Sequence, residues 1–394
     1  MPSKRTAAAL AAMKRVLLLL IWVVRLCFSV LLLVTFLSPA TADDFHGQAL
    51  PVSDVPPRAS LGTVRQIVPG AQEQQRLVTV EVTGGYGAGQ AITVIQHIGG
   101  PHGHELMVHP GDRVVLSATP LEDDELDWQI VDHQRAEPIW LLMGFTALAF
   151  ALVGGWRGLK TLMILALTLG TVAGILLPLT LRGWSPLPLA VVLAGFIALA
   201  TALLTSGAGR KTWTAVGGTT VSVFLAAMLS AVFVVWAKLS GAASEGSVML
   251  LGSLGVSIDA PGLLAASMLI GLLGVLLDLS LSIASAVDEL SGANPGMARA
   301  TLFQAGCQVG RDLLSTTSNT LMLAYLGGFL PVMLSLSVQP LSGLRVMHLE
   351  TVGTFAVTLL VGLASLLFTI PLTAWLSAIA QPRTPRLQKN DTET

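Results

Sequence analysis

From residue 138 onward the chain consists mainly of long apolar runs joined by short polar connections. A helix of about 20 apolar residues spans the hydrocarbon core of a bilayer, and it satisfies its own backbone hydrogen bonds there. These runs therefore predict a polytopic α-helical membrane protein with about seven core transmembrane helices. The expected spans are 138–153, 159–179, 187–205, 212–237, 260–281, 313–336 and 351–378.

Composition agrees with a membrane protein and separates one segment from the rest. The chain is 53% hydrophobic and only 11% charged, whereas soluble domains carry about 25% charged residues. Residues 43–137 hold 14 acidic and 5 basic residues, although the net charge of the whole chain is only −1. No basic face is present, so we expect no nucleic-acid partner. Cys27 and Cys307 lie in separate segments and are interpreted as structural thiols.

The N-terminal segment, residues 1–42, has the pattern of a signal peptide or an N-terminal anchor. Four basic residues precede an apolar run at 16–37, and small residues at Ala40 and Ala42 precede an acidic pair. Small residues at this spacing fit cleavage after Ala42 by a signal peptidase. The run is also long enough to remain as a membrane helix. Both alternatives send residues 43–137 out of the cytoplasm.

Residues 43–137 are predicted to form a small exported β domain. The segments 63–68, 76–83, 91–98 and 113–118 are rich in Val, Ile and Thr, and Gly- and Pro-containing turns separate them. Residues 128–131 are a candidate for a further strand. This pattern is typical of a compact barrel or sandwich.

Four histidines, His97, His102, His104 and His109, fall in one loop of this domain. They allow two readings, a metal site or a polar hairpin tip in water. A metal site needs ligands that converge in space, and no carboxylate or thiol pattern completes a known signature here. We therefore predict no metal and no cofactor.

Basic residues predict the orientation, because Lys and Arg accumulate on the cytoplasmic side. With the N-terminus inside, 13 basic residues fall on the cytoplasmic side and 3 in the outer connections. The chain is then a multipass membrane protein with both termini in the cytoplasm before any cleavage. Residues 138–380 form the helical membrane domain, and residues 381–394 form a disordered cytoplasmic tail.

The stretch from Asp278 to Tyr325 places acids, arginines and hydroxyls within two otherwise apolar spans. Charge at membrane depth is costly and calls for a partner or a water-filled cavity. Helical spacing puts the polar residues of each span on one face, and an Arg311–Asp278 or Arg311–Asp288 ion pair would offset the cost. The candidate path residues are Asp278, Ser282, Ser285, Asp288, Glu289, Arg311, Asp312, Thr316 and Asn319.

Two interpretations of these residues remain open. They form either a structural ion network at the membrane edge, with hydroxyls packing helix interfaces, or a hydrophilic path for an ion or small polar solute. The chain has no Walker motif, no His-Glu-x-x-His and no Gly-x-Ser-x-Gly. We therefore expect no enzymatic activity.

The same stretch resembles the signature of the YibE/F family of bacterial membrane proteins. The resemblance rests on Asp278–Leu290, Asn294-Pro295, Gly310-Arg311-Asp312 and Ser318–Tyr325, with further support from Gly154–Lys160. It covers roughly residues 60–380 and implies a multipass membrane protein with an exported β domain. The histidine loop is not part of it, so that loop inherits no role from the family.

Together these features favour a permease or channel-like transporter, with the lipid bilayer and an ion or small polar solute as its partners. The alternative is a non-transporting membrane scaffold that presents the exported β domain to an envelope protein.

Overall fold

The computed structural model describes residues 58–69, 75–97, 107–120, 126–241, 259–340 and 342–381. The expected signal or anchor at 1–42, the centre of the histidine loop with His102 and His104, and nearly all of the tail from 381 lie outside the described residues. The chain divides into two compact units, with the boundary between Ala149 and Phe150. Each unit is described by itself.

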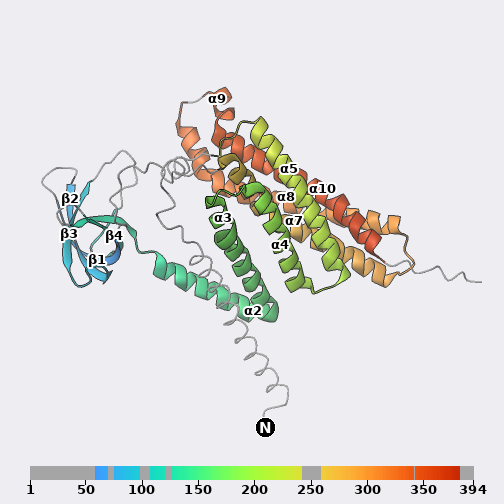
Figure 1. Ribbon diagram of the computed structural model, residues 1–394, viewed down its shortest axis with the longest axis horizontal. Coiled ribbons are helices and arrows are strands. Elements are labelled where there is room, and N and C mark those ends of the chain that lie inside the picture. Colours follow the sequence, from blue (N-terminus) through green and yellow to red (C-terminus); the bar gives the residue numbers. More distant parts are fainter. Residues whose placement is uncertain are drawn as a thin grey trace, which may run out of the picture. The chain divides into compact units, whose positions relative to one another are not determined.

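The first unit contains a five-stranded antiparallel sheet with the strand order β3-β2-β1-β4-β5 (Figure 1). The four strands expected from the sequence are confirmed, and residues 128–131 belong to a fifth. The strands are β1 (Arg58–Pro69), β2 (Gln75–Gly85), β3 (Ala91–His97), β4 (Arg113–Pro120) and β5 (Leu126–His133).

Alternation of buried and exposed residues along the strands makes the core of this sheet. Val78, Val80 and Val82 of β2 are buried, whereas the residues between them are only partly so. Gly62 of β1 allows the close packing, because a Cβ there would lie 2.5 Å from Cγ1 of Val80. The sheet curls enough for its two edge strands, β3 and β5, to contact each other. The result is a half-closed barrel.

The second unit is helical, and its helices are long. They are α2 (Ala136–Thr171), which begins in the first unit, the π-helical turn η2 (Val172–Leu176), α3 (Leu177–Leu181), α4 (Pro186–Ser206), α5 (Arg210–Trp236), α7 (Ala260–Ala293), α8 (Arg299–Val338), α9 (Gly343–Met347) and α10 (Glu350–Ala380). Six helical stretches among the described residues are long and apolar enough to cross a membrane, with Ala136–Leu181 counted as one.

Gly155 interrupts α2. Its φ of 52° and ψ of −131° are not helical, and glycine takes this conformation without the penalty that a side chain imposes. The two arms meet so closely that a Cβ on Gly158 would lie 1.9 Å from the carbonyl oxygen of Phe150. The sequence places two spans in this stretch, and the division into seven spans stays a prediction.

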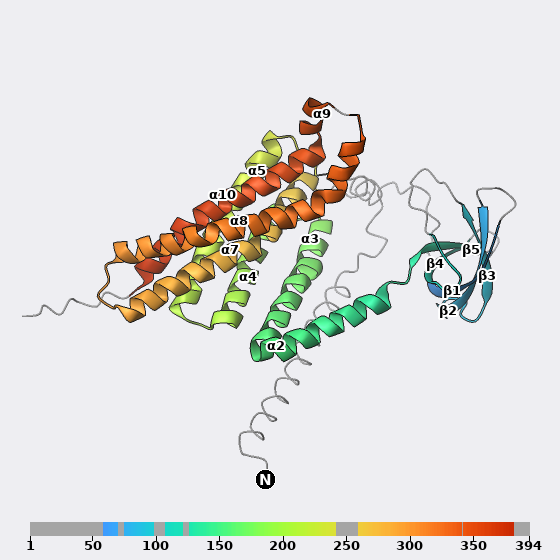
Figure 2. The same cartoon turned by 180° about the vertical axis from the view of Figure 1, so that it is seen from behind.

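The helical core forms where α5, α7 and α10 pack together, with α4 and α8 against them (Figure 2). Leu272, Leu276 and Ile283 of α7 are fully buried there, as is Leu366 of α10. Asp259 begins α7, and its carboxylate accepts a hydrogen bond from the backbone N–H of Gly262 at 2.9 Å. The predicted start of this helix is therefore confirmed.

Helix α8 is poorly enclosed, because the buried residues among its 40 are only Leu302, Gly306, Cys307, Gly310 and Leu321. In the most apolar 18-residue stretch of α8 only 6% of the residues are buried, whereas 50% are buried in the corresponding stretch of α7. It runs without interruption from Arg299 through Pro331 to Val338. A polar or charged residue on its outer side is therefore not covered by the rest of the described bundle.

Candidate functional site

Two glycines set the rotation of α8 against its neighbours. A Cβ on Gly306 would lie 2.9 Å from Val287 and 3.0 Å from Ala374. A Cβ on Gly310 would lie 2.5 Å from Ile370 and 3.1 Å from Ile283. Only glycine allows helices to approach this closely, so the glycine face of α8 points into the bundle between α7 and α10.

This contact also fixes the register of α7 and α8. Gly306 lies opposite Val287 and Gly310 opposite Ile283, which is the pairing of antiparallel helices. The level of Arg311 on α8 is therefore close to that of Ser282 on α7. Asp278 and Ser282 of α7 therefore lie at about the level of Arg311 and Asp312 of α8, whereas Asp288 and Glu289 lie nearer the C-terminal end of α7.

The candidate side chains lie mainly on the outer surface of this pair. Asp278, Ser282 and Glu289 of α7 are exposed, and Ser285 and Asp288 are half-buried. On α8 the exposed members are Arg311, Asp312, Thr316 and Asn319. We call these nine residues the polar face.

The predicted ion pair between Arg311 and Asp278 or Asp288 is wrong. No acidic oxygen of the described residues lies within 4.0 Å of Arg311. Asp288 instead accepts a 3.3 Å hydrogen bond from the Gln381 amide. The physical reason is the packing of Gly306 and Gly310, which turns the next residues of α8 away from the bundle.

Sequence reasoning missed a column of buried hydroxyls on α10. The column ends at the buried side-chain amide of Gln381, and its hydroxyls recur every fourth residue before it, at Ser365, Thr369, Thr373 and Ser377. Thr373 Oγ1 shares a 3.2 Å hydrogen bond with Ser280 Oγ of α7. A Cβ on Gly218 of α5 would lie 2.2 Å from the same oxygen. The regular four-residue spacing is the signal that would have identified this column.

A pocket of about 410 Å³ lies between α7, α8 and α10. Its lining includes Ser267 and Gly271 of α7, Tyr325 of α8, and Thr354 and Thr358 of α10. The hydroxyl oxygens of Tyr325 and Thr354 are buried and have no hydrogen-bond partner. These are groups that a polar ligand can satisfy.

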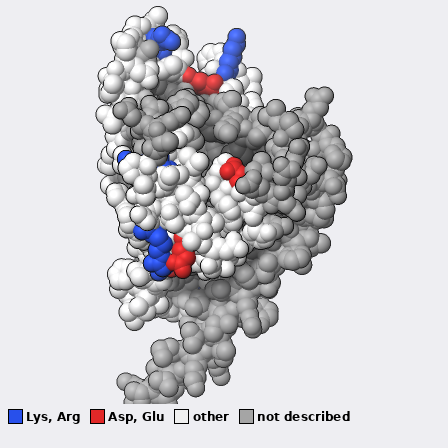
Figure 3. Space-filling view, turned by 90° about the vertical axis from the view of Figure 1, so that its left-hand side faces the viewer, with Lys and Arg blue, Asp and Glu red and all other residues white. Residues whose placement is uncertain are grey.

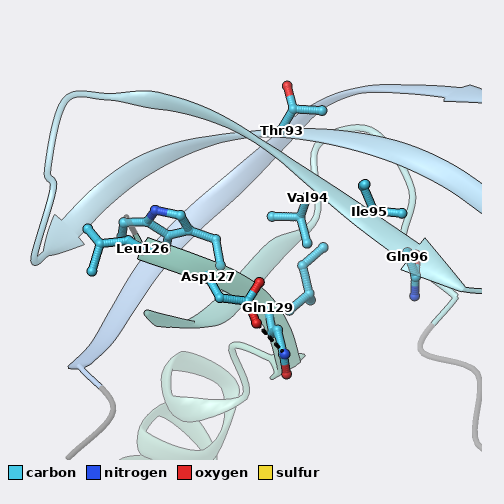
Figure 4. Close-up of a pocket in the computed structure, with 9 residues that line it drawn as sticks. Thr93, Val94, Ile95, Gln96, Leu126, Asp127 and Gln129 are labelled. Atoms are coloured by element: carbon cyan, nitrogen blue, oxygen red, sulfur yellow. Dashed lines mark hydrogen bonds between the residues drawn. The ribbon is translucent and has the colours of Figure 1, made fainter. Parts of the chain in front are cut away.

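The β unit has a groove of its own, with a volume of about 670 Å³, between the edge strands β3 and β5. Figure 4 shows its lining, with Thr93, Val94, Ile95 and Gln96 on one side and Leu126, Asp127 and Gln129 on the other. The Gln129 amide donates to Asp127 at 2.8 Å. Edge strands carry unpaired backbone groups, which an added strand can use.

Near the end of the same sheet, the pKa of Asp132 lies below its ordinary value. The main cause is the backbone N–H of His133, which donates to Oδ1 at 2.8 Å, and Arg135 adds an ion pair at 2.6 Å. Arg113 and Glu137 form a further ion pair within this unit. These contacts stabilise the last strand where the chain enters α2.

The described residues contain no group of three His, Cys, Asp or Glu side chains arranged to hold a metal ion. His109 is bound within its own turn, where its backbone N–H donates to Asp112 Oδ2 at 2.7 Å. Charged side chains also cover little of the described surface that Figure 3 displays. Five charged residues of the long helices belong to the polar face, namely Asp278, Asp288, Glu289, Arg311 and Asp312.

Long apolar helices and a polar face within them define a multipass α-helical membrane protein. The chain belongs to the YibE/F-like protein family, which matches residues 142–383. This match covers the polar face and most of the helical unit, and the five-stranded sheet lies outside it. Comparison with curated proteins found no match, and comparison with solved structures found none.

Proposed function

We propose that this protein is a permease or channel-like transporter that carries an ion or small polar solute along the polar face. The observation that carries the proposal is the exposure of Asp278, Arg311 and Asp312 on helices that are otherwise apolar. Charged groups at membrane depth face a protein interior or a water-filled cavity, because direct contact with lipid tails is costly.

The hydrogen bonding of this face supports a path more than a structural ion network. Ser282 Oγ donates to the carbonyl oxygen of Asp278 at 2.8 Å, and Thr316 Oγ1 donates to that of Leu313 at 3.0 Å. Both hydroxyls bond within their own helix and leave acceptor capacity free for a solute. A network would need the acids and Arg311 to pair, and no described pair includes Arg311. A second protein surface must complete the path.

The orientation is part of the proposal. Basic residues concentrate at one end of the helices, so we place the C-terminus in the cytoplasm and residues 43–137 outside it, in a bacterial inner membrane. The half-buried Asp288 and the exposed Glu289 then lie toward the cytoplasmic end of the path, and Asn319 lies deeper.

Flux through reconstituted vesicles tests the proposal, beginning with an unbiased comparison of ions and metabolites with and without the protein. We expect Asp278→Asn and Arg311→Gln each to reduce flux at least tenfold, and Asp278→Glu to restore part of it. Arg210→Gln is the matched control, because Arg210 is exposed at the start of α5 and off the polar face. Unchanged flux in folded Asp278→Asn and Arg311→Gln proteins would reject the path.

The groove between β3 and β5 favours a second candidate function, a scaffold that binds an envelope protein. Exposed Ile95 lies along one edge of the groove, and strand addition at such an edge is a common mode of recognition. A photo-crosslinker at position 95 of the full-length protein tests this in cells. A single cross-linked envelope protein, together with no detectable flux, would favour the scaffold over the transporter.

A further inference from the structure

We propose that the pocket between α7, α8 and α10 is a binding site for a small uncharged polar solute, held by the hydroxyls of Tyr325 and Thr354. The inference rests on the proposed transport function, and it names the class of solute and the place where that solute first binds. We call this cavity the hydroxyl pocket.

The two unpartnered hydroxyls are the first observation. Tyr325 of α8 and Thr354 of α10 both line the same cavity, and their hydroxyl oxygens are buried beside it without a partner. Buried polar atoms in folded proteins almost always have a partner, because leaving one unpaired is costly. Two such atoms on facing helices indicate a ligand that supplies the missing hydrogen bonds.

The other hydroxyls of the pocket are already satisfied. Ser267 Oγ donates to the carbonyl oxygen of Leu264 at 2.7 Å, and Thr358 Oγ1 donates to that of Thr354 at 2.7 Å. The need for a partner is therefore confined to Tyr325 and Thr354. This contrast makes Thr358 an internal control for Thr354 on the same helix.

The lining determines the class of ligand. None of the residues that line the pocket is charged. A multivalent ion would need carboxylates or many oxygen ligands around it. Phe329 and Phe355 stack with their ring centroids 4.3 Å apart and form an apolar wall. Apolar walls with a few placed polar groups are typical of sites for small neutral molecules.

The size of the pocket also fits a small solute. Its volume of about 410 Å³ corresponds to roughly 14 waters at about 30 Å³ each. Elsewhere between these three helices the packing is tight, because Leu272 of α7 and Leu321 of α8 lie against Gly362 of α10. A Cβ on Gly362 would lie 2.7 Å and 2.9 Å from these two leucines.

Gly271 connects the pocket to the polar face. A Cβ at this position would lie 2.6 Å from Tyr325 OH, so the hydroxyl keeps its place only because position 271 has no side chain. Asp278 is seven residues further along α7, which is two turns on the same helical face. Gly274 lies between them and is exposed. A solute leaving the pocket thus meets the exposed backbone of Gly274, beside the half-buried Val275, before it reaches Asp278.

The chain has only two tyrosines, Tyr86 and Tyr325, and this allows a direct test. Full-length protein labelled with 3-fluorotyrosine and placed in nanodiscs gives one ¹⁹F resonance for each tyrosine. Glycerol and urea are the neutral probes, and potassium chloride is the ionic comparison. Tyr86 is partly exposed on the β unit, so it reports general solvent effects.

We expect glycerol or urea to shift the Tyr325 resonance in a saturable way and to leave Tyr86 unchanged. Thr354→Val should weaken this response about fivefold to tenfold, because it removes one hydrogen bond. Thr358→Val should leave it unchanged. Gly271→Ala offers a second test, since it displaces the Tyr325 hydroxyl and should also weaken the response.

Two results would overturn the inference. One is a Tyr325 resonance that shows no saturable shift with either neutral probe. The other is a Tyr325 resonance that shifts in a saturable way with potassium chloride and with neither neutral probe, which would refute the assignment of an uncharged solute to the pocket. The flux assay and the ¹⁹F titration can fail independently of each other. A saturable shift without flux would reject the transport function but not the binding site. Flux without a saturable shift would reject the binding site alone.

Discussion

Replacement of Gly310 by Ala tests the packing that turns the polar face outward. The added Cβ would lie 2.5 Å from Cγ2 and 2.9 Å from Cγ1 of Ile370, about 1 Å closer than an ordinary carbon contact. Overpacking of this kind lowers the stability by about 1–3 kcal/mol. The higher helix propensity of Ala relative to Gly offsets up to about 1 kcal/mol of this loss. We expect a net loss of about 1–2 kcal/mol in the free energy of unfolding.

The assay is unfolding in mixed detergent micelles, followed by tryptophan fluorescence. Gly274→Ala is the matched control, because a Cβ there meets nothing within 4 Å, and it should be neutral or slightly stabilising. Ile370→Ala alone should cost about 2–5 kcal/mol. The double variant should be more stable than the sum of the single effects predicts, by roughly 1–2 kcal/mol. A Gly310→Ala protein as stable as the Gly274→Ala protein would refute the reasoning.

Three further predictions follow from particular contacts. Asp259→Ala should lower the free energy of unfolding by about 1 kcal/mol through loss of the α7 cap, whereas Asp259→Asn should change it little in the same micelle assay. Gly155→Ala should cost about 1–2 kcal/mol, because Ala would have to adopt the positive φ of 52°, and Gly154→Ala, which has open space around it, should not. The pKa of Asp132 is lowered in the folded state, so its stabilisation is present above the unfolded pKa and is lost as the pH falls through the folded value. Pepsin digestion of the full-length protein between about pH 4.5 and 2 should therefore detect opening of the β unit as the pH falls. The pH dependence of digestion should be weaker in the Asp132→Asn variant. An identical pH profile in that variant would contradict the stabilising role of Asp132.

Local patterns predicted the elements well where the physics is local. The strands around Val78–Val82 followed from the alternation of β-branched residues, and α7 begins at residue 260, where the predicted span 260–281 begins. The apolar runs identified the long helices in the same way. Gly155 falls in the connection predicted between the spans 138–153 and 159–179, and the backbone there leaves the helical conformation.

The orientation of the polar face could not be obtained from spacing. Periodicity correctly groups Asp312, Thr316 and Asn319 on one side of α8, but it leaves the rotation of that helix undetermined. The rotation depends on contacts of Gly306 and Gly310 with residues of α7 and α10 far away in the sequence. The hydroxyl pocket likewise needs Tyr325 and Thr354 to come together from two helices.

The hydroxyl column of α10 has a mechanical consequence. Ser365 and Thr369 donate to carbonyl oxygens of their own helix, and Thr219 and Ser222 of α5 do the same. Among the described hydroxyls of this interface, only the Ser280–Thr373 contact joins two helices through a hydrogen bond. Sliding α10 past its neighbours would therefore break this bond and the contacts at the two ends of α10, which Gln381 makes with Asp288 and Arg299 and Glu350 makes with Ser240. The hydrogen bonds within each helix would stay intact. The hydroxyls of the bundle interior therefore stabilise individual helices more than they fix the helices against one another.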